Sequence, residues 1–319
     1  MDVSVAICTW NRARLLDRTL AELRALRVPE GLAWEVLVVD NASSDDTAAI
    51  AARHAGALPL RAVREAQRGL SHARNRAIRE ARGALLAWTD DDVLVAHDWL
   101  AAYTRAAHEL PDAAFFGGPI LPEFEASPPA WIEAALPVIG SAFALCDWRD
   151  ERAALDAGHL PFGANFAVRS AVQRRYLFDP ELGRRGGELL SGDENEVFRR
   201  MLADGHAGWW LPEARVRHLV TRDRMTLEYL RRYYRGIGRS HVRARGPAPG
   251  PRYARMLESA AKACLKAMRS RLRRRLGVSP AWLEDLRDAN IHWGRFEALR
   301  DAERRAASSG DRAREAGRR

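Results

Sequence analysis

Ala87-Trp-Thr-Asp-Asp-Asp-Val-Leu94 is the stretch that decides the fold, because an apolar run beginning at Ala84 leads directly into three consecutive carboxylates. Acidic side chains are seldom buried without a partner, so three of them at the end of a buried strand require a positive charge nearby. A divalent cation that prefers oxygen ligands, such as Mg²⁺ or Mn²⁺, would supply it. Taken alone, the three acids are also consistent with a solvated turn that caps the next helix.

Strand and helix patterns alternate on the N-terminal side of this stretch. Apolar runs at 3–8, 35–40, 60–64 and 84–89 are separated by helical patterns, the first of which carries Leu16, Leu20, Leu23 and Leu26. This alternation predicts an α/β, Rossmann-like fold with a mostly parallel sheet flanked by helices. In such sheets ligands bind beyond the carboxyl ends of the strands, so we expect the loops at 9–12, 40 and 90–92 to converge on one crevice.

The loop after the first strand, Thr9-Trp-Asn-Arg12, carries no phosphate-binding glycine motif. A Gly-x-Gly-x-x-Gly is absent there, and no Gly-Lys-Ser/Thr occurs in the chain, so neither a dinucleotide-binding Rossmann site nor a P-loop is supported. We expect phosphates to be held by metal and side chains instead. The same absence weighs against a nucleotidyltransferase or phosphotransferase, which is the main alternative among enzymes.

Four segments in this order, at 5–12, 36–45, 69–75 and 89–92, resemble a family 2 glycosyltransferase of the GT-A fold. The resemblance covers residues 1–225 and implies that an inverting, hexosyltransferase-class enzyme moves a sugar from a nucleotide-sugar, most simply a UDP-sugar, to an acceptor hydroxyl. Polysaccharide, glycolipid or glycoconjugate synthesis of the bacterial type is the implied setting.

The resemblance also implies roles for individual side chains. Thr9, Asn11, Arg12 and Asp40 would contact the base and ribose, Arg74 and Asn75 would lie near the nucleotide, and Asp90 and Asp91 would lie near the ribose. Asp92 of the DXD motif would bind the metal, with Asp90 and a late histidine, His218, as further ligands. Since Mn²⁺ accepts imidazole more readily than Mg²⁺, His218 favours Mn²⁺.

A second acidic cluster, Gly192-Asp-Glu-Asn-Glu196, opens a helical pattern further along the chain. Acids in the first turn of a helix are stabilised by the helix dipole, and this structural role alone could explain the cluster. A carboxylate there can also take the proton from an acceptor hydroxyl. The family pattern Gly-Glu-Asp-x-Glu has its two acids exchanged here, so the base falls on Glu194, with Asp193 as the alternative. At the positive end of a helix we expect Glu194 to be ionised at neutral pH.

Two segments between these clusters carry weaker signals. The stretch 122–137 contains several prolines and is expected to be a loop on the acceptor side, since long loops in compact domains are usually functional. The run 163–169 reads as a strand after a flexible turn, and the resemblance would place Asn165 beside the donor sugar.

The C-terminal region is helical in pattern and strongly basic. Residues 231–319 contain 24 Lys and Arg against 9 Asp and Glu, a net charge of +15, whereas residues 1–230 have a net charge of −6. We therefore expect a basic helical region at 226–305, followed by a disordered tail at 306–319. An apolar stripe at Leu257, Ala261, Cys264, Met268 and Leu272 would either pack inside the protein or attach the helices to an anionic membrane.

Apolar runs, cysteines and aromatic residues in the sequence indicate where the protein is located and which partners it has. There is no apolar run long enough to span a bilayer and no signal-peptide pattern, which favours the cytoplasm, with peripheral attachment to the inner face of the cell membrane. Three widely spaced cysteines indicate reduced thiols. No nucleic-acid partner is expected, because aromatic residues are not interleaved with the basic run. A non-catalytic nucleotide-sugar-binding or nucleic-acid-binding protein remains the alternative outside enzymes.

Overall fold

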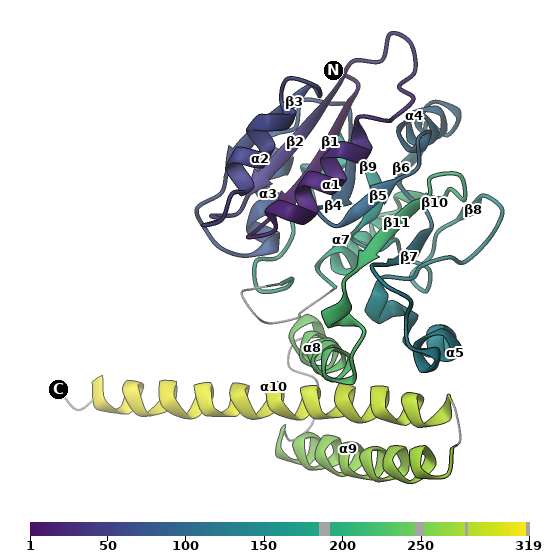
Figure 1. Ribbon diagram of the computed structural model, residues 1–319. Coiled ribbons are helices and arrows are strands. Elements are labelled where there is room, and N and C mark those ends of the chain that lie inside the picture. The colour runs from purple at the N-terminus through teal and green to yellow at the C-terminus, as the bar shows by residue number, and fades with distance from the viewer. Residues whose placement is uncertain (185–191, 246–251, 278–279, 317–319) are drawn as a thin grey trace. The chain divides into compact units, whose positions relative to one another are not determined.

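The computed structural model describes residues 1–184, 192–245, 252–277 and 280–316 (Figure 1). Their contacts divide the chain into two compact units. Of the described residues, the first unit contains 1–127, 143–184 and 192–222, and the second contains 128–142 and the residues from 223 onward.

The first unit is built on an eight-stranded sheet in the order β3-β2-β1-β4-β9-β6-β10-β8. The four N-terminal strands are all parallel, as the alternating pattern predicts, whereas β9 runs antiparallel to both β4 and β6. The strands are β1 (Val3–Thr9), β2 (Trp34–Asp40), β3 (Leu60–Arg64), β4 (Leu85–Asp90), β6 (Ala113–Gly117), β8 (Ala153–Ala154), β9 (Asn165–Arg169) and β10 (Ala207–Trp210).

Helices of the first unit cover this sheet, and its centre is apolar. They are α1 (Ala13–Leu23), α2 (Thr47–His54), α3 (Leu70–Glu80), α4 (Trp99–Glu109), α6 (Ser170–Gln173) and α7 (Asp193–Ala203). The predicted stripe on α1 is buried at Leu16, Leu20 and Leu23. Trp88 of β4 stacks on Phe166 of β9 with ring centroids 5.7 Å apart, which joins the parallel half of the sheet to the strand that reverses direction. The α/β fold with a mostly parallel N-terminal sheet is thus confirmed.

A second sheet of three strands lies beside the acidic stretch. Its order is β5 (Val93–Val95), β11 (Val216–Val220) and β7 (Ile120–Phe124). Strand β5 begins immediately after Asp92, and β11 pairs with it so that His218 lies opposite Val93. This pairing brings together two segments that are far apart in the sequence.

The second unit consists of helices α5 (Ala130–Ile139), α8 (Leu227–Arg245), α9 (Arg252–Arg275) and α10 (Ala281–Ala316). Helices α8 and α10 approach each other closely at two glycines, because a Cβ at Gly238 would collide with the Ile291 carbonyl and one at Gly294 with the Arg235 carbonyl. Asp285 on α10 is buried and pairs with Lys266 and Arg273 on α9. No described helix has the length and apolar character needed to cross a membrane.

Two expectations about irregular segments differ from the structure. The stretch 122–137 contains most of β7 and α5, and α5 forms despite Pro137 because Ile132, Ala135 and Ile139 form a buried face. Helix α10 continues to Ala316, into the tail that we expected to be disordered. Ala and Arg make up eight of the 14 residues of that tail, and both have high helix propensity. Residues 317–319 of that tail, like Ser191 before the second acidic cluster, lie outside the described residues.

Candidate active site

The ends of three parallel strands form one side of the site. In the sheet register Thr9 lies opposite Asp40, and Cys8 lies opposite Asp90. Convergence of these loops, expected from the strand order, is therefore confirmed. Asp40 is mostly buried, and its Oδ1 accepts a hydrogen bond of 2.9 Å from the backbone N–H of Ser43.

Asn11 joins the first loop to the second. It has a positive φ of 52°, a conformation that Asn tolerates better than most residues. Its Oδ1 accepts a hydrogen bond of 2.7 Å from the backbone N–H of Ser44, and its own N–H donates to the Ser43 hydroxyl. Asn11 thus fixes the loop after β1 against the loop after β2.

Arg12 supplies the positive charge that the acidic stretch requires. Its Nη1 lies 2.7 Å from Asp91 Oδ1 and 2.9 Å from Asp92 Oδ2, and both carboxylates are almost completely buried. Burial raises the pKa of Asp91 to about 6, against the lowering effect of Arg12, and the neighbouring charge of Asp92 contributes to the rise. Asp90, the last residue of β4, is only partly buried. The triplet is therefore a buried ion-pair network with one carboxylate at its open edge.

His218 lies next to the same network. Its Nε2 is 3.4 Å from Asp92 Oδ1, as a result of the β5–β11 pairing. Adjacent ligands of an octahedral cation with bonds of about 2.1 Å stand about 3 Å apart, so these two atoms fit a shared metal ion. Among the described residues, however, no group of three or more His, Cys, Asp and Glu side chains is placed to hold a metal. Asp92 and His218 alone would therefore need oxygen ligands from a bound diphosphate to complete the coordination.

Arg74 forms the other side of the site. From α3 its Nη1 reaches Asp193 Oδ2 at 2.7 Å and Glu194 Oε2 at 3.4 Å, both at the start of α7. Its guanidinium lies over the Phe178 ring, 5.1 Å from the centroid. A Cβ at Gly163 would collide with this guanidinium, so the glycine leaves the room that Arg74 needs.

The two acids at the start of α7 differ sharply. Asp193 has a side chain 2% exposed and is held by Arg74; burial opposes its ionisation, but the Arg74 charge and hydrogen bonds keep its pKa below the usual range. The Glu194 side chain is 13% exposed, and burial together with the Asp193 charge raises its pKa to about 8. The prediction that Glu194 is ionised at neutral pH is therefore wrong for this state, because these effects outweigh the helix dipole.

Cys8, which we did not consider as a site residue, connects the two sides. Burial raises the pKa of its thiol, and the charges of Arg74, Asp90, Asp91 and Asp193 all act on it. Charges from both acidic clusters thus act on one partly buried thiol near the end of β1. The only signal in the sequence for Cys8 is that it lies near the end of the first predicted strand, which pairs with the strand that ends at Asp90.

Three asparagines have structural contacts that the sequence did not indicate. Asn75 exchanges two hydrogen bonds with the backbone of Phe178. Asn165 is fully buried and makes four hydrogen bonds, to Trp99, Tyr103 and two backbone carbonyls. Asn41, which we did not single out, binds the backbone of Glu65, Gln67 and Gly69 and so fixes the loop before α3. The amides of Asn75 and Asn165 therefore hold the walls of the site together.

Comparisons with known proteins agree with this arrangement. Residues 4–148 match the model of the family described as Glycosyl transferase family 2. The chain is 27% identical over 251 residues to the succinoglycan biosynthesis protein ExoM of Rhizobium meliloti (strain 1021). The aligned region covers 76% of this chain and 75% of that protein.

Solved structures show the same fold. The mannosyltransferase PcManGT from Pyrobaculum calidifontis, in complex with GDP-Man and Mn²⁺, matches with a TM-score of 0.62 and 21% identity over 94% of this chain and 87% of that chain. S. aureus TarS 1–349 in complex with UDP-GlcNAc matches with a TM-score of 0.52 and 17% identity over 74% of this chain and 66% of that chain, slightly less than two thirds of its length. Its strand-end site, its GT-A fold and the match over residues 4–148 identify this chain as a glycosyltransferase that is similar to glycosyl transferase family 2.

Proposed function

We propose that the protein transfers a sugar, with inversion, from a nucleotide-sugar donor to an acceptor hydroxyl in polysaccharide, glycolipid or glycoconjugate synthesis. The observation that carries this proposal is the position of Glu194. Its side chain is the more exposed of the two acids that Arg74 binds, and the charge of Asp90 also acts on Arg74. One site thus combines a proton acceptor with a surface for a diphosphate.

The donor is proposed to be a nucleoside diphosphate sugar, with a UDP-sugar as the first candidate. TarS is described with UDP-GlcNAc and PcManGT with GDP-Man, so both bases occur among proteins of this fold. Thr9, Arg12 and Asp40 stand at the ends of β1 and β2, where a base and ribose would lie. Asp90, at the open edge of the triplet, is proposed to accept a hydrogen bond from a ribose hydroxyl.

A divalent cation, Mn²⁺ or Mg²⁺, is proposed to bind Asp92 and His218 together with the diphosphate. PcManGT is described with Mn²⁺. When bound, such an ion neutralises the charge that develops on the leaving diphosphate. Arg12 already neutralises part of the triplet, and its 30% exposed side chain is proposed to contact the phosphates as well.

Glu194 is proposed to take the proton from the acceptor hydroxyl as it attacks the sugar carbon. The bond that breaks joins this carbon to the diphosphate, which leaves with the electron pair. A carboxylate with a pKa of about 8 is a stronger base than an ordinary glutamate, although a smaller fraction is ionised at neutral pH. Asp193, held ionised by Arg74, sustains this high pKa and acts as a positioning residue.

A thermal-shift screen of UDP-, dTDP- and GDP-sugars with and without Mn²⁺ tests donor binding, because a ligand that binds the folded state raises the melting temperature. One nucleoside diphosphate sugar should stabilise the protein, and Mn²⁺ should increase the effect. Turnover should release a nucleoside diphosphate. Release of pyrophosphate would identify the alternative nucleotidyltransferase and contradict the proposal.

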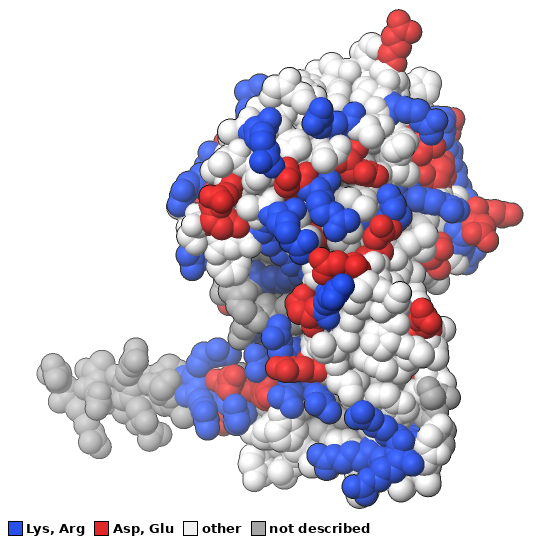
Figure 2. Space-filling view, in the orientation of Figure 1, with Lys and Arg blue, Asp and Glu red and all other residues white. Residues whose placement is uncertain are grey.

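The basic helices are proposed to attach the protein to an anionic membrane surface, on the cytoplasmic side. The predicted apolar stripe lies on α9 and faces solvent: its members Leu257, Met268 and Leu272, and Leu265 of the same helix, are each more than half exposed. The face of α9 that packs inward is made of small residues such as Ala263. Figure 2 shows Lys and Arg side chains gathered at the same helix. An exposed apolar face next to cations is typical of helices that lie in a membrane interface.

Vesicle sedimentation tests the attachment. Full-length protein should sediment with anionic vesicles at low salt and be released as salt screens the attraction, while neutral vesicles should retain little. Leu265→Gln together with Leu272→Gln should weaken sedimentation. Leu177→Gln, at an exposed leucine in the first unit, is the matched control. Binding that is indifferent to lipid charge would contradict the proposal.

A further inference from the structure

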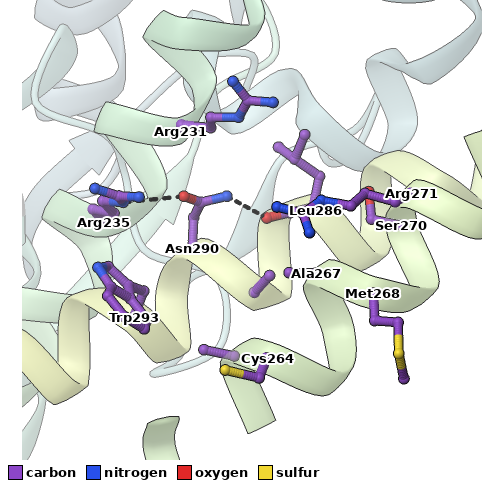
Figure 3. A pocket seen from close by; sticks show the side chains of 12 residues that line it. Arg231, Arg235, Cys264, Ala267, Met268, Ser270, Arg271, Leu286, Asn290 and Trp293 are labelled. Atoms are coloured by element: carbon purple, nitrogen blue, oxygen red, sulfur yellow. Dashed lines mark hydrogen bonds between the residues drawn. The ribbon is translucent and has the colours of Figure 1, made fainter. Parts of the chain in front are cut away.

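A groove lies within the second unit between α8, α9 and α10, with a volume of about 590 Å³ (Figure 3). This volume is within the range of about 300–1,000 Å³ that is common for small-molecule sites. Its apolar lining comes from α9 and α10 and includes Ala263, Ala267, Leu286 and Ala289. Met268, also in the lining, belongs to the exposed apolar face of α9, so the groove adjoins that face.

Three arginines stand around this apolar lining. Arg231 enters from α8, Arg271 from α9, and Arg235 from α8 near Trp293 (Figure 3). Arg235 already donates to Asn290 Oδ1 at 3.2 Å.

Arg231 and Arg271, by contrast, have no carboxylate within ion-pair distance among the residues that the structure describes. Other cations of α9 do have such partners, because Lys266 and Arg273 both form ion pairs with Asp285. Two solvent-exposed guanidinium groups without a carboxylate partner therefore lie beside the apolar part of one groove.

We propose that this groove holds one phosphate-bearing membrane lipid. The phosphate binds Arg231 and Arg271, since a guanidinium forms paired, charge-assisted hydrogen bonds with phosphate oxygens. The hydrocarbon chain follows Ala263, Ala267 and Leu286 toward Met268, where the groove meets the exposed face of α9. The apolar part of the lining favours a ligand with a hydrocarbon chain over a hydrated anion, and the two arginines favour an anionic lipid over a neutral one. This site extends the membrane association proposed above from a general surface attraction to one stoichiometric ligand.

Titration with a lipid that is dissolved as single molecules distinguishes binding in this groove from general attraction to a membrane surface. Isothermal titration of the full-length protein with dihexanoylphosphatidic acid, below its micelle concentration, should give one site. Dihexanoylphosphatidylcholine and inorganic phosphate should each bind at least about tenfold more weakly, because each lacks one half of the proposed recognition. Equal affinity for inorganic phosphate would overturn the lipid assignment, and absence of binding would overturn the site.

Variants with matched charge changes locate the site. Arg231→Gln together with Arg271→Gln should weaken binding at least about tenfold. The control pair Arg232→Gln and Arg275→Gln removes the same charge from exposed positions on the same helices, outside the groove lining, and should change affinity by less than about twofold. Equal losses in both pairs would show that binding follows overall charge and would overturn the proposal.

A third variant tests the apolar half independently of charge. Ala267→Phe places a ring in the groove and should abolish lipid binding. The melting curve of the variant and its affinity for the nucleotide-sugar donor should both be unchanged. These two measurements show that the variant is folded and that its first unit is intact. Lipid binding at the original affinity in Ala267→Phe would place the lipid elsewhere. If the native protein bound no nucleotide-sugar donor, the proposed function would be contradicted, but the assignment of the groove would still stand.

Discussion

Replacing Asp193 with Asn should lower the pKa of Glu194 and shift the pH dependence of sugar transfer. Glu194 has its pKa raised from 4.5 to about 8 by burial and then by the charge of Asp193. The substitution removes that negative charge while keeping the size of the side chain. It also removes the main partner of Arg74, whose Nη1 lies 3.4 Å from Glu194 and would then act on this carboxylate.

The structure sets the magnitude of the shift. A charged neighbour within about 4–6 Å typically moves a carboxyl pKa by about 1–3 units. Loss of Asp193 should therefore bring the pKa of Glu194 from about 8 to between about 5 and about 7. Burial, the larger cause, is unchanged, so we do not expect the pKa to return fully to that of a solvated glutamate.

The assay is the pH dependence of kcat/KM for release of the nucleoside diphosphate, which reports groups of the free enzyme. The base must be deprotonated, so kcat/KM of the native protein should rise with pH and level off above about 8. In Asp193→Asn this rise should move to lower pH. In Glu194→Gln it should disappear, with activity lower by about 10²–10⁴-fold. Asp193→Asn should reduce the plateau activity less than Glu194→Gln does.

A matched control and a clear refutation are available. Asp204→Asn removes the same charge at the other end of α7, where Asp204 accepts a hydrogen bond from Tyr176, and should leave the profile in its native position. An unchanged profile in Asp193→Asn would refute the electrostatic reasoning. Native activity in Glu194→Gln would show that another group takes the proton.

Three further outcomes follow from other contacts of the site. Because the folded-state pKa of Glu194 is raised, the folded protein holds a proton that the unfolded chain releases, so the free energy of unfolding should fall between about pH 4.5 and about pH 8; chemical denaturation should show a smaller fall in Glu194→Gln. Asp92→Ala should abolish the gain in nucleoside diphosphate affinity that Mn²⁺ produces over EDTA in calorimetry, and equal affinity under both conditions in the native protein would contradict metal dependence. Asn165→Ala should reduce the free energy of unfolding by about 2–4 kcal/mol, since it leaves the buried donors of Trp99 and Tyr103 without their acceptor, and a loss below about 0.5 kcal/mol in urea denaturation would show that water replaces the amide.

The sequence alone determined the class of fold and the edge of the sheet where the site lies. Periodicity is a local property, so the alternation of strands and helical stripes was readable, and parallel strands necessarily bring Thr9, Asp40 and Asp90 to one edge. The need of three buried acids for a positive charge was also readable, because it follows from the cost of burying charge. The resemblance to family 2 rested on such local segments.

Tertiary structure alone decided which charges meet. Arg12 is 79 residues from Asp91, and Arg74 is 119 residues from Asp193, so neither pair leaves a periodic signal in the chain. The position of His218 beside Asp92 depends on the pairing of β11 with β5. The pKa of Glu194 depends on burial and on a neighbour held by a distant arginine, which is why local reasoning from the helix dipole predicted the wrong protonation state. Long-range packing sets the dielectric surroundings and the partners of each group, and a local pattern contains neither.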